Sequence, residues 1–474
     1  MALLVPLFLL LVVAPACLST PTILPLYRHL PHVAETAQQH PLSRLAAASL
    51  ARASHLKHSS SQQHGTGTTT KLYSHSYGGY AFTALLGTPA QQVAMLLDTG
   101  SQLTWVPCTS RYQCRNCSFS SSSIPTFIPK RSSTSRLIGC HNPSCQWVHS
   151  KSSNKSSSNS KCDGTNNNVC PPYAVVYGSG STAGLLIADT LRTGAGGMVM
   201  KKNLVLGCSL VSVHQPPSGL AGFGRGAPSL PAQLGLNKFS YCLLSRRFDD
   251  NTAVSGQLLL GAADHHTNLQ YVPLLNKDTP AASMSPYSVY YYLALTGITV
   301  AGKPVRLPQR AFVAGANGGG GAIIDSGTTF TYLDPTVFQP VAAAIIAAVG
   351  GRYNRSREVE HALGLRPCFA IPRGGPKMEL PELSFQFKGG AQMLLPLENY
   401  FVVAGITHLQ KEEEKDEEEE AICLAVITDI ANGPVGGGPA IILGSFQQQN
   451  YLLQYDLQHH RIGFRRQPCA SSTS

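Results

Sequence analysis

The 474-residue chain has little charge and little tryptophan: charged side chains make up 13% of its residues, and it contains two Trp. Beyond the N-terminal segment, no stretch offers the roughly 20 uninterrupted apolar residues that a membrane span requires, so the sequence predicts none. Acidic residues are also scarce, and eight of them fall in residues 412–420, which we interpret as a solvated loop. The Lys and Arg are scattered and do not form a stripe with aromatic residues, which argues against a nucleic-acid partner. The net charge of +11 instead suits contact with acidic surfaces or substrates.

Cysteine is plentiful, but it lacks the spacing of a metal site. Cys114 and Cys117 form a CxxC motif with no second pair at zinc-ribbon spacing, so disulfides are favoured and metal binding stays the alternative. Of 13 Cys, Cys17 is expected to leave with an N-terminal leader. The remaining 12 are an even number, consistent with six disulfides formed in an oxidising compartment.

The N-terminus has the character of a secretion signal. Residues 1–19 are apolar and end in small residues, although no basic residue precedes them, and we interpret them as a signal peptide. The C-terminal residues form no hydrophobic tail of the kind that precedes a lipid anchor. Asn116, Asn154 and Asn354 each begin an Asn-x-Ser sequence, so they are candidate glycosylation sites on the same route.

Two short motifs carry the chemistry of the chain. Asp98-Thr99-Gly100-Ser101 follows the apolar run 93–97, and Asp325-Ser326-Gly327-Thr328 follows the run 322–324. Each run predicts a buried strand that carries a carboxylate to its end, followed by a turn in which the glycine adopts angles closed to other residues. One copy alone is commonly an ordinary turn. Two copies predict facing carboxylates, of which one holds a proton and the other accepts one, as the addition of water to a peptide carbonyl requires.

Between the signal and residue 73 the composition is basic, with Glu35 as the one acid. We interpret residues 20–72 as a removable prosegment with a helix starting at Pro41. Its basic side chains are hypothesised to neutralise the two carboxylates until low pH releases them; the candidates are Arg28, Arg44, Arg52, Lys57 and Lys71. The alternative is a disordered basic leader with no inhibitory role.

The rest of the chain predicts a mostly β protein with two lobes. Short apolar segments alternate with turns rich in Gly and Pro, of which there are 44 and 32. Strands are expected at 80–86, at the run into Asp98 and at 290–300, and a helix at 341–349. Residues 108–170 are rich in Ser, Asn and Cys and have little apolar material, so disulfides are expected to hold them together.

From about Tyr73 to Cys469, these motifs resemble the pepsin-like aspartic proteases, in particular their plant atypical, nepenthesin-like branch. The Cys-rich insertion at 108–170 favours that branch. The resemblance implies an all-β, bilobal fold with a central cleft, with an N-terminal lobe at 73–275 that includes the insertion and a flap, and a C-terminal lobe at 276–474. It places Asp98 and Asp325 on the catalytic pair.

The resemblance also assigns supporting residues around that pair. Ser101 and Thr328 match hydroxyls that bond to the outer carboxylate oxygens. The sequence 177–184 matches the flap hairpin, which would place Tyr177 and Gly178 over the cleft, and Trp105 matches an indole that hydrogen-bonds to the flap tyrosine.

Further segments match conserved parts of the family's framework. Residues 220–222 and 442–444 match the hydrophobic-hydrophobic-Gly segments behind the catalytic loops, and 239–242 and 455–464 match sheet elements that join the lobes. The resemblance pairs Cys368 with Cys423, and Cys242 with Cys469.

The function implied is a secreted, monomeric aspartic endopeptidase that hydrolyses protein or peptide substrates at acid pH. It would be blocked by pepstatin-like inhibitors and would need no metal or cofactor. The apoplast is the expected destination, with vacuole and plastid left open. The alternative is a catalytically inactive homologue that binds a cell-wall glycosidase, as the cereal xylanase inhibitors do. A sugar-binding role is disfavoured, because one of the two Trp is assigned to the flap.

Overall fold

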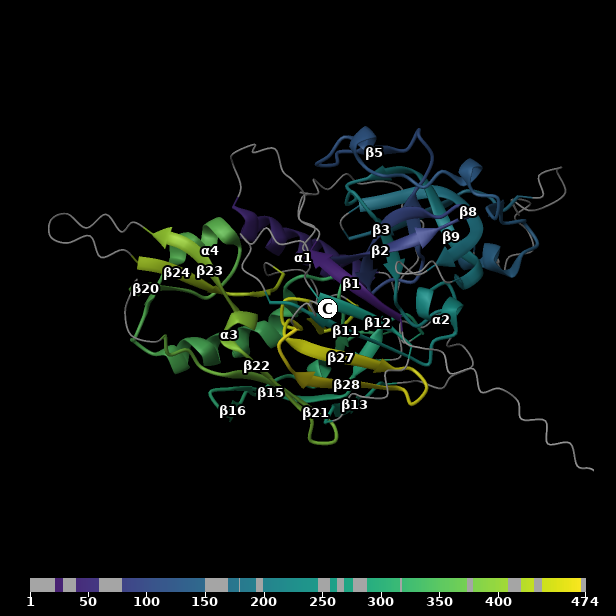
Figure 1. Ribbon diagram of the computed structural model, residues 1–474. Helices are drawn as coiled ribbons and strands as arrows, with labels where there is room; N and C mark the ends of the chain where they lie inside the picture. The colour runs from purple at the N-terminus through teal and green to yellow at the C-terminus, as the bar shows by residue number, and fades with distance from the viewer. Residues whose placement is uncertain are drawn as a thin grey trace, which may run out of the picture.

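The computed structural model describes residues 22–28, 40–58, 79–149, 169–178, 180–192, 199–245, 256–261, 268–275, 288–315, 318–372, 378–407, 419–429 and 437–469. The expected signal peptide at 1–19 and the candidate glycosylation site Asn154 lie outside these ranges. The fold is all-β and bilobal, as predicted, and Figure 1 shows the blue and teal N-terminal half beside the green C-terminal half.

The described N-terminal half is built from strands separated by turns, with one long and one short α-helix. Its elements are β1 (Thr22–Arg28), α1 (Pro41–His58), β2 (Tyr80–Leu86), β3 (Gln91–Asp98), β4 (Trp105–Pro107), β5 (Gln113–Arg115), β6 (Arg136–Leu137), β7 (Tyr173–Tyr177), β8 (Gly180–Arg192), β9 (Val199–Val213), β10 (Gly219–Gly222), α2 (Leu230–Leu234), β11 (Lys238–Leu243) and β12 (Gly256–Leu260). The predicted strands at 80–86 and into Asp98 are confirmed as β2 and β3.

The described C-terminal half has the same character, again with one long and one short α-helix. It comprises β13 (Gln270–Pro273), β14 (Tyr291–Leu293), β15 (Leu295–Val300), β16 (Lys303–Pro304), β17 (Ala322–Ile324), β18 (Thr331–Leu333), α3 (Pro335–Val349), β19 (Asn354–Arg355), α4 (Arg357–Leu363), β20 (Cys368–Pro372), β21 (Leu383–Phe387), β22 (Gln392–Leu395), β23 (Phe401–Thr407), β24 (Glu419–Leu424), β25 (Val426–Ile427), β26 (Ile441–Leu443), β27 (Tyr451–Asp456) and β28 (Arg461–Arg466). The helix predicted at 341–349 begins earlier, because Asp334 caps it by accepting a hydrogen bond from Thr336 N at 3.1 Å.

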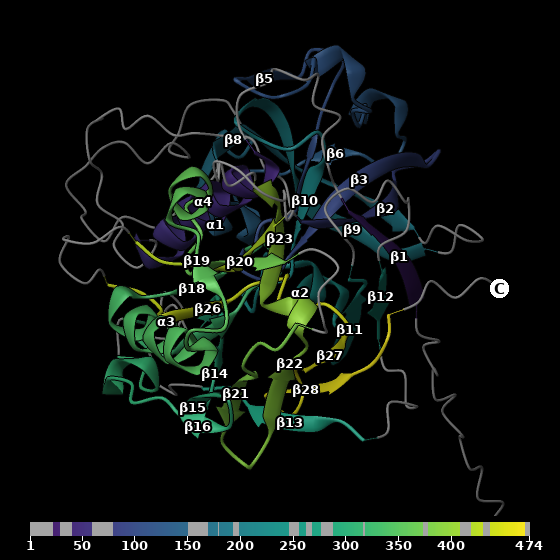
Figure 2. The same ribbon diagram turned by 90° about the vertical axis from the view of Figure 1, so that its left-hand side faces the viewer.

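Six neighbouring strands of one large sheet join the two halves. Their order is β13-β28-β27-β11-β12-β1, and Figure 2 shows them in succession. The predicted connection is β11 against β27, in which Phe239 lies opposite Tyr455 and their rings stack at a centroid distance of 4.4 Å. Burying such aromatic pairs stabilises the junction on which the relative position of the halves depends.

The two halves repeat one local arrangement at the end of each Asp-bearing strand. β3 runs parallel to β10, which in turn pairs antiparallel with β4. In the same way β17 runs parallel to β26, which pairs antiparallel with β18. These are the segments 220–222 and 442–444 that the resemblance placed behind the catalytic loops, and their repetition brings the two aspartates together.

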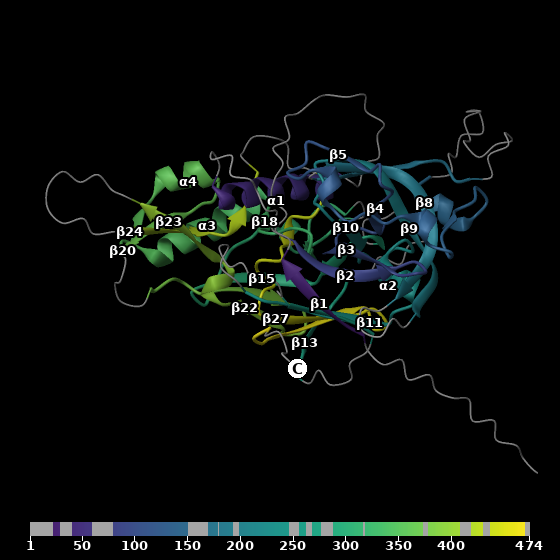
Figure 3. The same ribbon diagram turned by 45° about the horizontal axis from the view of Figure 1, so that its top comes forward.

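Residues before the first lobe are ordered where the structure describes them. The predicted helix is present as α1, and its apolar face is buried on the C-terminal half through Leu42, Leu45, Ala46, Ala53 and Leu56. Figures 1 and 3 show α1, in purple, between the two halves. The strand β1 was not predicted. It pairs with β12 and β2, so residues 22–28 form part of the central sheet.

Disulfides brace both halves. The predicted pairs Cys242–Cys469 and Cys368–Cys423 are confirmed. The insertion is tied down by three further bonds and Cys140 is disulfide-bonded as well; the three are Cys108–Cys208, Cys114–Cys117 and Cys145–Cys170. The disulfide within the CxxC motif rules out the metal-binding alternative there, because the thiolate is the metal ligand. None of the helices in the described ranges is long and apolar enough to cross a membrane.

Candidate active site

Asp98 and Asp325 lie at the ends of β3 and β17, and both are buried. Their hydrogen bonds are nearly symmetric. Asp98 Oδ2 accepts from the Ser101 hydroxyl at 2.6 Å, and Asp325 Oδ2 accepts from the Thr328 hydroxyl at 2.6 Å. The structure therefore places both predicted hydroxyls on the carboxylates.

Gly100 and Gly327 bring the two carboxylates close to each other. Their amides donate to Oδ1 of their own aspartates, at 3.0 Å from Gly100 and 2.9 Å from Gly327. A Cβ on Gly100 would lie 2.6 Å from Asp325 Oδ1, and one on Gly327 would collide with Asp98. Neither glycine has a positive φ, so our prediction that they supply special backbone angles was wrong. Glycine is required here by close approach.

The second residue of each motif locks the two loops together. Thr99 N donates to Ser326 Oγ at 3.1 Å, and Ser326 N donates to Thr99 Oγ1 at 2.9 Å. The Ser326 hydroxyl also donates to Leu97 O at 2.8 Å. Sequence reasoning missed this role, although a hydroxyl residue directly after each Asp was a usable signal.

Gln448 supports the second loop from behind. Its side chain is buried and donates to Leu443 O at 2.8 Å and to Asp325 O at 3.3 Å, while accepting from the Tyr241 hydroxyl at 2.6 Å. A buried amide with three partners fixes its surroundings firmly, because leaving any of them unpaired is costly. The polar run at 447–449 gave no sign of burial in the sequence.

One cation from α1 binds both candidate catalytic carboxylates. Arg52 Nη2 lies 2.7 Å from Asp98 Oδ1, and Arg52 Nε lies 3.2 Å from Asp325 Oδ2. The guanidinium is buried with them. This is the arrangement hypothesised for the prosegment, and it singles out Arg52 among the five basic candidates.

The charges around the pair set opposite pKa directions. Burial is the largest influence on Asp98 and, together with the charge of Asp325, raises its pKa to about 6 despite Arg52. Burial also pushes the pKa of Asp325 upward, but the charge of Arg52 and the hydrogen bond from Thr328 outweigh it and hold that pKa below its ordinary value. Burial disfavours the charged form of Arg52, yet both aspartates raise its pKa further above neutrality. The pair therefore shares its protons unequally.

Two more residues fix α1 on the C-terminal half. Ser49 Oγ accepts from Phe330 N at 3.0 Å, directly beside the second Asp motif. Near the end of the helix, Lys57 Nζ lies 2.6 Å from Asp429 Oδ2. The helix therefore crosses the dyad with polar contacts at three points along its length.

The flap lies over α1, with Tyr177 at the end of β7. The Tyr177 and Trp105 rings lie 6.4 Å apart, but among the described residues neither the Tyr177 hydroxyl nor the indole N–H has a hydrogen-bond partner. Burial raises the pKa of the Tyr177 hydroxyl, and the indole lies close enough to lower it in part, but the two polar atoms do not have the geometry of a full hydrogen bond. Gly178 packs against the backbone of Ala51 and Arg52, so the helix occupies the space beneath the flap.

A cavity remains beside the dyad, between α1 and the flap. Its lining combines helix, flap and both Asp loops: Ala48, Ser49, Arg52, Gly79, Leu96, Leu97, Asp98, Tyr177, Gln215, Pro216, Leu220, Gly327 and Thr329. The helix α1 itself supplies Ala48, Ser49 and Arg52 to this lining. An extended peptide could lie along this route only after the helix has moved away.

Two candidate glycosylation sites are within the described ranges. Asn116 and Asn354 are both exposed, so an attached glycan would extend into solvent.

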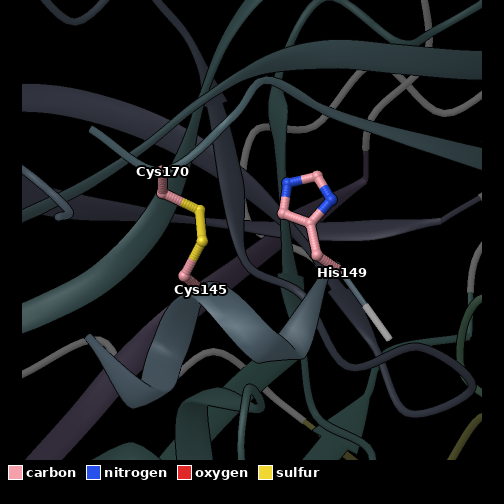
Figure 4. Close-up of side chains that lie close together, drawn as sticks. All are labelled: Cys145, His149 and Cys170. Carbon is pink, nitrogen blue, oxygen red and sulfur yellow. A yellow bond between two sulfur atoms is a disulfide. The ribbon is translucent and has the colours of Figure 1, made fainter. Parts of the chain in front are cut away.

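One group of possible metal ligands occurs in the described part of the chain. Cys145, His149 and Cys170 place their ligand atoms within 4.8 Å of one another. Figure 4 shows that the two sulfur atoms are joined in a disulfide, with the imidazole beside it. Because a disulfide sulfur is not a thiolate, this group does not fit a metal ion.

Comparison with known proteins agrees with this geometry. A family model described as "Xylanase inhibitor N-terminal" matches residues 80–262, and one described as "Xylanase inhibitor C-terminal" matches residues 290–466. The chain is 31% identical over 425 residues to a probable aspartyl protease of Arabidopsis thaliana, covering 83% of this chain and 82% of the relative. The chain belongs to the pepsin-like aspartic protease family. It is also 31% identical to the aspartic proteinases nepenthesin-2 and nepenthesin-1 of Nepenthes gracilis, in each case over 86% of this chain and 82% of the relative.

Solved structures show the same fold. The crystal structure of edgp has a TM-score of 0.58 at 21% identity and covers 83% of this chain and 92% of its own. Basic 7S globulin from soybean has a TM-score of 0.58 at 19% identity, covering 96% of this chain and 97% of its own. At these identities the likeness concerns the fold alone. The nepenthesin-like assignment rests on the sequence relatives.

Proposed function

We propose that the protein is an aspartic endopeptidase that α1 keeps latent at neutral pH and that acid releases. The observation that carries the catalytic part is the symmetric pair Asp98 and Asp325, each bonded to its own hydroxyl and glycine amide. The named aspartic proteases among its relatives support it.

In the open form, the two carboxylates hold a water molecule between them. The ionised carboxylate takes a proton from this water as it attacks the scissile carbonyl, and the protonated carboxyl stabilises the carbonyl oxygen. As it does so, the protonated carboxyl passes its proton to that oxygen, and a neutral gem-diol forms. The C–N bond then breaks as the proton taken from water is passed to the leaving amine, while the other carboxylate takes a proton from a gem-diol hydroxyl, so the pair again holds one proton. The exchange between Thr99 and Ser326 keeps the carboxylates at the separation that this sharing requires. No metal or cofactor takes part in this scheme.

Latency is carried by Arg52. Its guanidinium donates to both carboxylates, and α1 fills the space beneath Tyr177, so an extended peptide cannot reach the pair. The segment would leave after cleavage within the chain, making the described form a zymogen. Secretion, glycosylation at Asn116 and Asn354, a monomeric state and inhibition by pepstatin-like compounds belong to the same proposal.

The test is cleavage of denatured globin between pH 2 and 8 by the full chain, with and without pepstatin. The variants Asp98→Asn and Asp325→Asn are compared with Glu379→Gln, a control on an exposed side chain. Acid cleavage that pepstatin blocks, and that falls about 10²- to 10⁴-fold in both Asp variants but not in the control, supports the proposal. Folded, processed wild-type protein without cleavage would overturn it and favour a family member that only binds other proteins.

A further inference from the structure

The repeated arrangement gives the two halves equivalent aromatic residues beside the dyad. Trp105 follows Asp98 by seven residues, and Tyr332 follows Asp325 by seven. Trp105 lies opposite Leu220 in the β4–β10 pair, and Tyr332 lies opposite Ile442 in the corresponding β18–β26 pair. Tyr332 therefore has, in the C-terminal half, the place that Trp105 has under the flap. This position flanks the route that a bound chain follows past the dyad.

Tyr332 holds a cation from α1. Lys57 Nζ donates to the Tyr332 hydroxyl at 2.6 Å and to Asp429 Oδ2 at 2.6 Å, and it lies 4.8 Å from the centroid of the Tyr332 ring. The Tyr332 hydroxyl donates in turn to Asp429 Oδ2 at 2.7 Å. A carboxylate, a hydroxyl and an aromatic face are each favourable partners for an ammonium group.

The anionic side of this cluster belongs to the lobe and not to the helix. Tyr332 lies on β18, which runs parallel to β25 with Tyr332 opposite Ile427, and Asp429 follows two residues later. Among the described residues of this lobe, Arg310 is engaged elsewhere, since its Nη2 lies 3.1 Å from the buried Asp334. Departure of α1 would therefore remove the cation paired with Asp429 while leaving Tyr332 and Asp429 in place.

The distance of Tyr332 and Asp429 from the dyad determines which substrate residue could place a cation where Lys57 now lies. Lys57 comes five residues after Arg52, which is about 7.5 Å along a helix at 1.5 Å per residue. An extended peptide covers this distance in about two residues at 3.3 Å each. We infer that, in the released protease, Tyr332 and Asp429 bind a lysine or arginine side chain of the substrate about two residues from the scissile bond. This inference rests on the proposed function.

Cleavage of matched peptides tests the inference. Each peptide carries either Lys or norleucine, which has a similar length and no charge, at one position within three residues of the scissile bond. At pH 5 the acid-processed protein should cleave the Lys peptide about tenfold faster in kcat/KM at one position. Asp429→Asn should abolish that preference, and Glu379→Gln should keep it. Equal preferences in wild type and Asp429→Asn, or no Lys preference at any position, would overturn the inference.

Binding provides a second readout that does not depend on catalysis. The same peptide pairs are made with a reduced, non-cleavable bond, and binding to acid-processed protein is followed by the change in tryptophan fluorescence. Tighter binding of the Lys peptide, lost in Asp429→Asn and reduced in Tyr332→Phe, supports the subsite even if no peptide is cleaved, in which case only the proposed function fails. If peptides are cleaved but neither assay shows a preference for Lys, the proposed function stands and the inferred subsite is wrong.

Discussion

Thr99 and Ser326 exchange backbone-to-hydroxyl hydrogen bonds between the two Asp loops, at 3.1 and 2.9 Å. Because both amides are buried, removing one hydroxyl leaves a donor without a partner. We expect Ser326→Ala to lower the free energy of unfolding by about 1–3 kcal/mol, since Ser326 Oγ also donates to Leu97 O. Urea unfolding followed by fluorescence measures the loss. Ser122→Ala, on an exposed serine of the insertion, is the matched control and should change it little.

Arg52 is the only described α1 residue with ion pairs to the dyad. Replacing it by Met keeps an unbranched, flexible side chain but removes the guanidinium and its charge, so α1 is left with its other anchors. We expect Arg52→Met to shorten the latent period and to give cleavage at pH 5 to 6, where wild-type protein stays inactive. The measurement is globin cleavage against time after a pH jump. Arg44→Met, on the same helix, should behave as wild type, and equal latency in both variants would contradict the role of Arg52.

The pH at which latency ends follows from the effect of Arg52 on the carboxylates. In the latent form Arg52 lowers the pKa of both Asp98 and Asp325, so release of α1 lets the pair take up protons more readily, and falling pH favours release. Asp98, with a pKa of about 6, is already largely protonated at pH 5. Asp325, whose pKa is held below its ordinary 3.8, keeps the ion pair until the pH falls further.

We therefore expect processing of the full chain to be slow at pH 5 and to accelerate below about pH 4, as followed by the loss of intact chain on gels. In Arg52→Met the steep rise should disappear or move to higher pH. A wild-type rate that stayed constant between pH 3 and 6 would contradict the linkage.

The parts of the site that sequence predicted are local. Asp98, Ser101 and their counterparts act within one turn, so four consecutive residues carry the whole signal. The parts that it missed depend on segments far apart in the chain. Gln448 hydrogen-bonds to the second Asp loop only because β26 and β11 bring it behind Asp325. The polar residues next to it in the sequence give no indication that it is buried.

The interpretation of the prosegment was limited in the same way, by contacts between segments far apart in the chain. Composition identified five basic candidates, but only the docking of α1 on the C-terminal half selects Arg52. The apolar spacing of that helix was present in the sequence, yet its partner surface is assembled from strands more than 200 residues away. The strand β1 was missed for this reason, since its partners β2 and β12 lie far along the chain.

The flap is expected to change its hydrogen bonding when α1 leaves. In the described form, the Trp105 indole N–H and the Tyr177 hydroxyl are buried near each other without the geometry of a full hydrogen bond, and the backbone of α1 packs beside Gly178. With that space open, the Tyr177 hydroxyl can approach the indole N–H and accept its hydrogen bond. We therefore expect that Trp105→Phe costs the latent chain little free energy of unfolding from a lost hydrogen bond. In the processed form, it should lower kcat/KM about tenfold. Comparing both quantities with those of Trp147→Phe, the chain's other tryptophan, separates the two effects: equal losses of activity in both variants would show that the flap does not depend on this contact.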